Sequence, residues 1–207
     1  MGTPQIELKV LAPSDWPVVE RLFRPRGVTG GCWCMWWRRR GGKTWDACKG
    51  EQNRLAFRAL VQDGKAHGII AFAAGEPVGW CNFGPREDFP RLVTSRVLQR
   101  PTAARRWSVA CFFVRSGWRR QGIAQLLLER AVAESFRRGA EEVEGYPKTY
   151  PSAPSAPAAF VWTGLPRMFE AAGFVLVKAE GSERVIYVRK RDGTLRRRRH
   201  HPLRPSS

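Results

Sequence analysis

The sequence predicts an α/β domain, in which strands and helices alternate around one sheet. Three observations favour this class: an opening strand followed at once by a helix, a central strand, glycine-containing loop and long amphipathic helix, and a closing pair of strands. The 207 residues, 43% of them hydrophobic, suffice for one packed core and are few for two. We therefore expect a single domain over residues 1–190 and a basic, disordered tail over residues 191–207.

The chain opens with a strand and a helix. Apolar and polar residues alternate over residues 6–10, which is the pattern of a strand with one buried face. Ser14 or Asp15 can then cap a short helix that runs through Leu22. Residues 24–45 are dense in Gly, Arg and Trp, and we expect them to form a structured loop.

A helix and a hairpin are expected next. The helix begins near Thr44 and carries an apolar face as far as Val61. Two apolar runs, at residues 69–74 and 78–83, are separated by the Gly-Glu-Pro sequence of residues 75–77, which predicts a turn between two antiparallel strands.

The centre of the chain predicts the strand, loop and helix that matter most for function. Residues 84–106 contain three prolines and many charges, so we expect mostly loop with a helical turn at residues 92–98. Residues 107–114 form an apolar run typical of a buried strand, and a helix is expected over residues 121–138. One face of that helix carries Ile123, Leu127, Leu128, Ala131 and Ser135.

The last third of the chain predicts three strands and one helix. Residues 141–146 indicate a strand, whereas residues 147–157 are too rich in Pro, Ser and Ala for a helix or a strand and predict a surface insertion. A short helix over residues 167–172 is followed by a strand pair at residues 174–177 and 185–188.

The charge of the chain is strongly positive and unevenly placed. Of the formal net charge of +18, residues 189–207 carry +7, which leaves +11 on the body. A basic body attracts phosphorylated ligands and nucleic acid alike, so the charge does not choose between them, and a nucleic-acid contact through the tail stays open. The sequence has no apolar run of membrane-spanning length and no signal-like start, which favours a cytoplasmic protein with no membrane contact.

The five cysteines do not indicate a disulfide framework or a metal site. Their number is odd and they are scattered along a chain of medium length, so we expect reduced thiols. Cys32, Cys34 and Cys48 lack a fourth ligand at useful spacing, so we expect no metal. Cys111 has no histidine nearby in the sequence, and we expect it to pack as a small hydrophobic residue.

The loop between the central strand and helix predicts an anion site. Glycine lets the backbone approach a phosphate closely, and the first N–H groups of a helix point toward it. Arg119 and Arg120 add positive charge beside those groups. A glycine-containing turn before a helix also occurs as ordinary loop structure, so this pattern by itself leaves both interpretations open.

The sequence of residues 114–124, VRSGWRRQGIA, resembles the acyl-CoA signature of the GNAT (Gcn5-related) N-acetyltransferases. Arg119, Gly122 and Ala124 fill the signature positions. The ending FEAAGF, residues 169–174, is similar to the helix-to-strand turn of that family, and the resemblance covers residues 6–190. Residues 31–38, 78–80 and 144–147 resemble a bacterial branch whose substrate is unknown.

The resemblance implies a fold and a cosubstrate. The fold is a mixed, mostly antiparallel sheet of about six to seven strands with helices on both faces. The cosubstrate is acetyl-CoA, and no metal is required. Its pyrophosphate would lie in the loop formed by Arg119, Arg120, Gln121, Gly122, Ile123 and Ala124, and its pantetheine arm would enter where strand 107–114 splays from strand 141–146, using backbone groups of Phe112 and Val114.

The resemblance also implies direct attack of a neutral amine on the thioester, for which a base and an acid are usual. Glu144 is the candidate base. The position at which the family usually has its tyrosine acid holds Phe169, which has no proton to give, so Tyr146 is the candidate acid. A glutamate exposed on a strand and a tyrosine packed at a strand end are the alternative interpretations.

The acceptor is the least determined part of the prediction. Trp33, Trp36 and Arg38 fall where the family builds its acceptor wall, although the indole rings are equally suited to pack the loop onto the sheet. Arg38 would suit a carboxylate on the acceptor. We expect transfer to a primary amine of a small molecule or peptide; a protein or RNA-associated target, and a non-catalytic protein that binds acyl-CoA or nucleic acid, are alternatives. A homodimer is possible.

Overall fold

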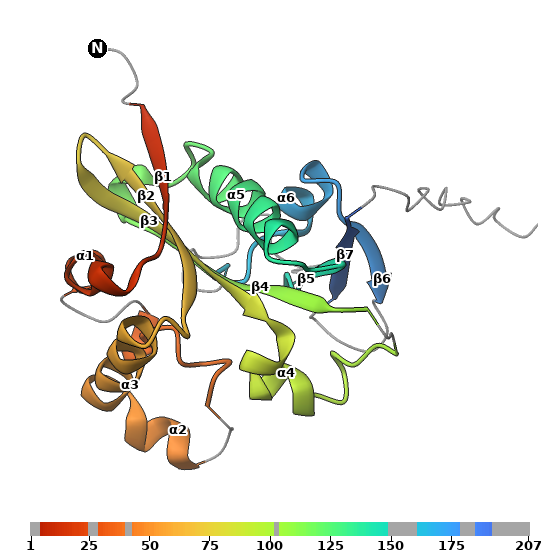
Figure 1. Cartoon of the computed structure of the whole chain (residues 1–207), viewed down its shortest axis with the longest axis horizontal. Coiled ribbons are helices and arrows are strands. Elements are labelled where there is room, and N and C mark those ends of the chain that lie inside the picture. The colour runs from red at the N-terminus through yellow and green to blue at the C-terminus, as the bar shows by residue number, and fades with distance from the viewer. Residues whose placement is uncertain are drawn as a thin grey trace, which may run out of the picture.

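The computed structural model describes residues 5–24, 29–39, 43–101, 104–148, 161–178 and 185–191. These residues form one sheet covered by helices on both faces, as the sequence predicts (Figure 1). The strands are β1 (Ile6–Val10), β2 (His67–Ala73), β3 (Glu76–Pro85), β4 (Arg106–Val114), β5 (Glu142–Gly145), β6 (Val175–Lys178) and β7 (Ile186–Lys190). The helices are α1 (Trp16–Phe23), α2 (Lys43–Cys48), α3 (Glu51–Gln62), α4 (Pro90–Thr94), α5 (Ile123–Arg137) and α6 (Pro166–Ala171).

The sheet has seven strands in the order β1-β2-β3-β4-β5-β7-β6. β4 and β5 run parallel and are joined by α5, whereas the other neighbouring strands are antiparallel. A parallel pair needs a crossover connection, and α5 provides it. The expected mixed, mostly antiparallel sheet is therefore confirmed.

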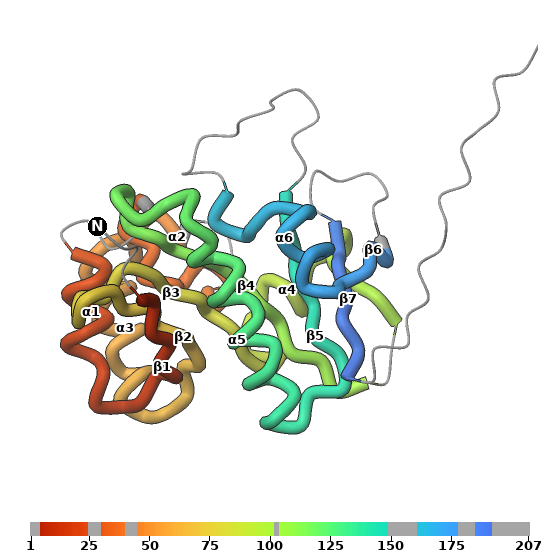
Figure 2. Tube along the Cα trace, turned by 90° about the horizontal axis from the view of Figure 1, so that it is seen from above, coloured from red at the N-terminus to blue at the C-terminus, as the bar shows by residue number. Residues whose placement is uncertain are grey.

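Alternate residues of the central strands feed two separate cores, as the side-chain period of a strand requires. Ile69 packs with α5 and α6 on one face, whereas Ile70 packs with α1 and α3 on the other. Figure 1 shows α5 and α6 above the sheet and α3 and α4 below it, and Figure 2 shows the same elements seen from above. None of the described helices is long and apolar enough to cross a membrane.

A glycine on β3 sets the distance between α5 and the sheet. A Cβ atom at Gly79 would lie 3.0 Å from Cγ2 of Ile123 and 3.2 Å from Cδ1 of Leu127. These distances are shorter than ordinary van der Waals contact, so glycine is needed for this approach. The start of α5 is thereby held tightly against the strand that pairs with β4.

The structure differs from the sequence-based expectation in two helices. The helix expected from Thr44 is interrupted, because Gly50 takes a left-handed conformation at φ 79° and separates α2 from α3. The expected helical turn at residues 92–98 is observed earlier, as α4, because Pro90 suits the first position of a helix. Most of the predicted insertion at residues 147–157 and of the tail lies outside the described residues.

Candidate active site

The pairing between β4 and β5 ends in the middle of the sheet. Their parallel pairing runs from Arg106 opposite Glu142 to Val109 opposite Gly145, and β4 then continues to Val114. The second half of β4 therefore has no strand partner on this side among the described residues. This is the divergence expected between the two strands.

Other parts of the chain occupy the open edge of β4. The carbonyl of Ala110 accepts a hydrogen bond from Nε1 of Trp37 at 2.9 Å. The N–H of Phe112 donates to the carbonyl of Trp162 at 2.6 Å. The carbonyl of Val114 accepts from Nε of Arg119 at 2.9 Å. The backbone groups of Phe112 and Val114, which the resemblance assigns to acetyl-CoA, thus face the open edge of β4, and both have partners within the chain.

The loop before α5 passes through two left-handed residues into the start of the helix. Arg120 and Gly122 both have left-handed backbones, at φ 62° and 78°, and Gly122 is the residue from which α5 begins. A Cβ atom at Gly122 would meet no atom within 4 Å, so the glycine faces open space. Because α5 begins at Ile123, the first N–H groups of the helix have no intrahelical acceptor and point out of its N-terminal end.

The side chains of the loop are exposed. Arg119, Arg120, Gln121 and Gly122 are exposed, whereas Ile123 is buried and anchors the helix to the core. The amide Nε2 of Gln121 donates to the carbonyl of Gly117 at 3.1 Å, which closes the loop on itself. The loop residues named from the sequence therefore do lie together beside the end of β4.

A cavity of about 360 Å³ lies against the open edge of β4. It is lined by Gly30, Cys32, Cys34, Trp36, Trp37, Trp45, Lys49, Cys111, Phe112 and Trp162. Of the expected acceptor residues, Trp36 lines this cavity, and so does Phe112 of the expected cofactor set. We name it the tryptophan pocket.

The other two expected acceptor residues lie elsewhere. Trp33 is 5% exposed and packs in the core against Trp16 and Phe23, with ring centroids 5.9 and 5.7 Å away. The guanidinium of Arg38 stacks on Phe89 at 4.8 Å and lines a different cavity, beside Asp88. The structure therefore brings Trp36 to the tryptophan pocket but not Trp33 or Arg38.

Glu144, the expected base, is fully buried among cations. Its Oε2 accepts from Nε of Arg86 at 3.1 Å and from the hydroxyl of Tyr146 at 2.7 Å. Its Oε1 accepts from Nη2 of Arg100 at 3.0 Å and from Nη1 of Arg106 at 3.5 Å. Both oxygens are thus saturated, and Glu144 lines neither cavity.

Tyr146, the expected acid, belongs to the same buried cluster. Its hydroxyl lies 2.8 Å from Oγ of Ser108, in addition to its bond to Glu144. Burial, with the charge of Glu144 beside it, raises the pKa of Tyr146 far above its usual value. We name this cluster, with Arg86, Arg100, Arg106 and Glu142, the glutamate network.

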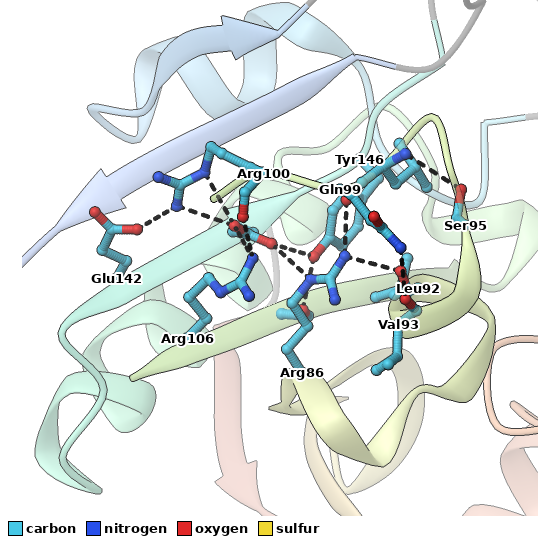
Figure 3. A network of polar contacts seen from close by, with 12 residues as sticks. Arg86, Leu92, Val93, Ser95, Gln99, Arg100, Arg106, Glu142 and Tyr146 are labelled. Atoms are coloured by element: carbon cyan, nitrogen blue, oxygen red, sulfur yellow. Dashed lines mark hydrogen bonds and ion pairs between the residues drawn. The ribbon is translucent and has the colours of Figure 1, made fainter. Parts of the chain in front are cut away.

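The glutamate network ties the segment between β3 and β4 to β5. Nη2 of Arg86 donates to the carbonyls of Leu92 and Leu98 at 2.8 and 2.7 Å, and Arg100 also contacts Glu142 (Figure 3). The three arginines come from positions remote from Glu144 in the sequence, and no local pattern indicates that they converge on it.

Phe169 is a core residue. It is fully buried, and a Cβ atom at Gly145 would lie 2.0 Å from its Cε1 atom, so the ring rests directly on the backbone of β5. Phe174 and Tyr187 surround the ring at centroid distances of 5.1 and 6.1 Å. The aromatic ring at this position therefore packs β5 against β7 and α6.

Three cysteines meet in the tryptophan pocket. The sulfur of Cys34 lies 3.6 Å from that of Cys111 and accepts from Nε1 of Trp80 at 3.1 Å. Burial raises the pKa of Cys34 well above its usual value, and burial with the nearby Cys111 raises that of Cys32 to about 11. The described residues contain no group of three or more His, Cys, Asp or Glu that could hold a metal.

Comparison of the structure with solved structures gives the same fold. It superposes with a TM-score of 0.52 on the PaiA N-acetyltransferase of Thermoplasma acidophilum in complex with coenzyme A, at 14% identity over 90% of this chain and 99% of the other. The GNAT family N-acetyltransferase YhbS of Escherichia coli in complex with CoA gives 0.51, at 17% identity over 92% and 83%. The GNAT domain of PAT from S. lividans gives 0.50, at 14% identity over 89% and 90%.

The sequence itself carries the family assignment. No curated protein gives a significant match. Residues 33–155, more than half of the chain, match the model of the acetyltransferase (GNAT) family. This matched region includes both the loop before α5 and the diverging strands β4 and β5. The chain therefore belongs to the acetyltransferase (GNAT) family.

Proposed function

We propose that the protein transfers an acetyl group from acetyl-CoA to a primary amine by direct attack. The observation that carries this proposal is the left-handed Gly122 at the start of α5, next to the edge of β4 that β5 leaves open. Family membership supports an acetyltransferase. Two of the similar structures contain coenzyme A, which supports the choice of cosubstrate.

The pyrophosphate would lie on the loop before α5. We propose that the N–H groups of Gly122, Ile123 and Ala124 bind its oxygens, because helix N-termini attract anions. Arg119 and Arg120 add positive charge there, although Nε of Arg119 is already held by the carbonyl of Val114. A glycine with open space before it lets the phosphate approach the backbone.

The thioester would lie at the edge of β4. Backbone N–H groups aimed at the carbonyl oxygen stabilise the negative charge that forms when an amine attacks. The N–H of Phe112 now donates to Trp162, so we propose that the carbonyl of Trp162 releases it when acetyl-CoA enters. Acetyl-CoA supplies the activated acetyl group, and the chain supplies position and hydrogen-bond donors.

Glu144 and Tyr146 have a supporting role in this proposal. Their polar atoms are committed to the glutamate network and they do not reach the tryptophan pocket. We propose that they hold β5 in place while β4 diverges from it.

A non-catalytic acyl-CoA-binding protein is the second candidate, because the described residues that line the pocket include no carboxylate or imidazole.

Calorimetric titration with acetyl-CoA tests the cosubstrate site. Gly122→Asp should abolish binding, because it places a charge and a side chain against the pyrophosphate and strains a left-handed backbone. Gly64→Asp is the matched control: Gly64 also has a positive φ, of 69°, and a Cβ there would meet only Cγ of Pro13 at 4.0 Å.

The two variants separate the possible outcomes. Micromolar binding by the wild type and by Gly64→Asp, lost in Gly122→Asp, supports the site. Unchanged affinity in Gly122→Asp removes the loop assignment. Acetyl-CoA binding without transfer to any amine in a broad screen would favour the non-catalytic candidate.

A nucleic-acid contact of the basic tail remains a prediction, since residues 192–207 lie outside the described part of the chain.

A further inference from the structure

The tryptophan pocket is unusually aromatic. Four of its lining residues are tryptophans, which come from three separate segments: Trp36, Trp37, Trp45 and Trp162. Trp36 and Trp45 meet edge to face at 4.9 Å, and the ring of Trp162 lies 5.7 Å from that of Trp37 and 6.3 Å from that of Trp36. Such surfaces bind flat, apolar molecules by stacking and by edge contacts.

A cation already covers one face of the Trp36 ring. The guanidinium carbon of Arg91 lies 3.8 Å from the ring centroid of Trp36 and 5.5 Å from that of Trp45. Nε of Arg91 donates to the carbonyl of Arg39 at 2.9 Å, which fixes it there. Lys49 also lines the pocket, and its ammonium is paired with Asp46 at 2.5 Å. The fixed guanidinium of Arg91, beside the pocket, disfavours a ligand that arrives positively charged.

The described lining also offers little to remove a proton. Its titratable side chains are those of Cys32, Cys34, Cys111 and Lys49, with Arg91 behind Trp36 and Trp45. Burial raises the pKa values of Cys32 and Cys34, so these thiols stay protonated at neutral pH. Glu144, the nearest candidate base by sequence, is held by three arginines.

These conditions disfavour an alkyl amine as the acceptor. With a pKa near that of lysine, roughly one molecule in a thousand is neutral at pH 7. The charged majority is repelled by Arg91 beside the pocket and finds no carboxylate or imidazole base among the described lining residues. An amine attached to an aromatic ring is a far weaker base and is uncharged at neutral pH. It is therefore not repelled by a cation and needs no base to free its lone pair.

We propose that the acceptor is an aromatic amine, with its ring among the indoles of the tryptophan pocket and its nitrogen toward the thioester at β4. This inference rests on the proposed acetyl transfer and names its substrate class. A cavity of about 360 Å³ lies near the lower end of the roughly 300 to 1,000 Å³ range of ligand sites, which suits a molecule of one or two rings.

The reaction balances without a protein base. The amine nitrogen forms a bond to the thioester carbonyl carbon, and the carbonyl electrons move to its oxygen. When this adduct collapses, the carbon–sulfur bond breaks and the sulfur leaves with its electron pair. The nitrogen of the adduct is strongly acidic, and its proton ends on the thiolate, directly or through water. The products are an N-aryl acetamide and coenzyme A.

Two isomeric amines test the proposal on the wild-type protein. 4-Methylaniline and benzylamine have the same atoms and differ in whether the nitrogen is on the ring. Acetyl transfer is followed by release of the CoA thiol and by mass detection of the amide. At pH 7 we expect kcat/KM for 4-methylaniline to exceed that for benzylamine by roughly a hundredfold or more.

The pH profile sharpens this test. Between pH 6.5 and 8.5 the rate with 4-methylaniline should stay flat, whereas that with benzylamine should rise by roughly tenfold per pH unit as its ammonium loses its proton. A higher rate with benzylamine at pH 7 overturns the inference, as does an inert 4-methylaniline with a protein that binds acetyl-CoA. A protein that does not bind acetyl-CoA instead contradicts the proposed function.

A pair of variants ties the preference to the pocket. Trp45 is only partly buried and lines the cavity. Trp45→Leu should raise KM for 4-methylaniline by about three- to tenfold, and Trp45→Phe should restore most of the loss, because it keeps an aromatic face. Melting temperatures of both variants check that they are folded. Equal KM values in the two variants would contradict stacking on this residue.

Discussion

Two clusters of side chains flank the point where β4 leaves β5. One is built from buried, paired charges, and the other is built mostly from aromatic rings and thiols. In the glutamate network, Glu144 is fully buried and is paired with Arg86, Arg100 and Arg106. In the tryptophan pocket, the lining is mostly aromatic and sulfur-containing, and an open volume of about 360 Å³ remains. One cluster fixes the strands and the other leaves room for a molecule.

This difference teaches that a buried carboxylate is not by itself a sign of catalysis. Structural ion-pair networks place carboxylates in the same low-dielectric surroundings as active sites do. What distinguishes Glu144 is that both oxygens are committed to arginines or to Tyr146, whereas a general base needs a free lone pair within reach of the amine.

The largest effect should follow from removing the charge of Glu144. In Glu144→Gln the three arginines lose their common anion inside the protein, and we expect the free energy of unfolding to fall by about 3 to 5 kcal/mol. Urea denaturation measures this loss. If Glu144 has a structural role only, the folded fraction of the variant keeps its kcat. A loss of kcat with unchanged stability would restore Glu144 as the base.

Glu141→Gln is the control for that experiment. Glu141 lies on the same stretch of chain, but its side chain is 49% exposed and its partner Arg105 is 71% exposed. Ion pairs of this kind contribute less than about 1 kcal/mol. A similar loss of stability in both variants would mean that the network around Glu144 stabilises the fold no more than the exposed pair of Glu141 and Arg105 does.

Phe169→Tyr should have the next largest effect. It restores the residue usual at this position in the family, but the ring rests on Gly145 and is fully buried. A hydroxyl without a partner there costs about 1 to 3 kcal/mol. We expect lower stability by thermal denaturation and no gain in kcat. An increase in kcat would indicate that the hydroxyl reaches the reacting thiol and that the ring position is catalytic.

The sequence predicted the order of the elements and a candidate anion-binding turn before α5 because these depend on local patterns. Alternating apolar residues, a glycine before a helix and a helix with one apolar face are each visible within a few positions. The assignment of this turn to acetyl-CoA came from the family resemblance. The divergence of β4 from β5 was not visible in this way and came from the family resemblance. The structure confirms the mixed sheet, and the role of the loop remains a prediction.

The sequence could not separate the two clusters because both depend on contacts between distant segments. Arg86 and Arg100 lie 58 and 44 residues from Glu144. In the loop of residues 29–39, Trp33 and Cys34 have left-handed backbones, at φ 44° and 58°. That turn sends Trp33 into the core and leaves Trp36 at the pocket, and no periodicity in an irregular loop indicates which indole goes where.

Tyr146→Phe distinguishes the clusters with a smaller perturbation. It removes the hydroxyl that bonds to Glu144 and Ser108, and we expect a loss of about 1 to 2 kcal/mol in the free energy of unfolding. The kcat for acetyl transfer should not change, because this hydroxyl does not face the pocket. Tyr187→Phe, which removes the hydroxyl that a second buried tyrosine donates to Glu170, is the matched control. A fall in kcat specific to Tyr146→Phe would support Tyr146 as the acid.

The smallest effect concerns the thiols of the tryptophan pocket. Burial raises the pKa of Cys32 from 9.0 to about 11, so the native thiol keeps its proton where the unfolded chain loses it. A pKa that is raised in the folded state stabilises the fold fully below pH 9, and this contribution is lost as the pH rises through 11.

Alkylation measures this directly. Iodoacetamide reacts with the thiolate, so native Cys32 should be labelled slowly at pH 8 and faster as the pH approaches 11, whereas the urea-unfolded chain is labelled readily at pH 9. Mass spectrometry of the peptide that contains Cys32 gives both rates. Rapid labelling of the native protein at pH 8 would mean that the pocket holds a reactive thiolate, and the acceptor site would then contain a base after all.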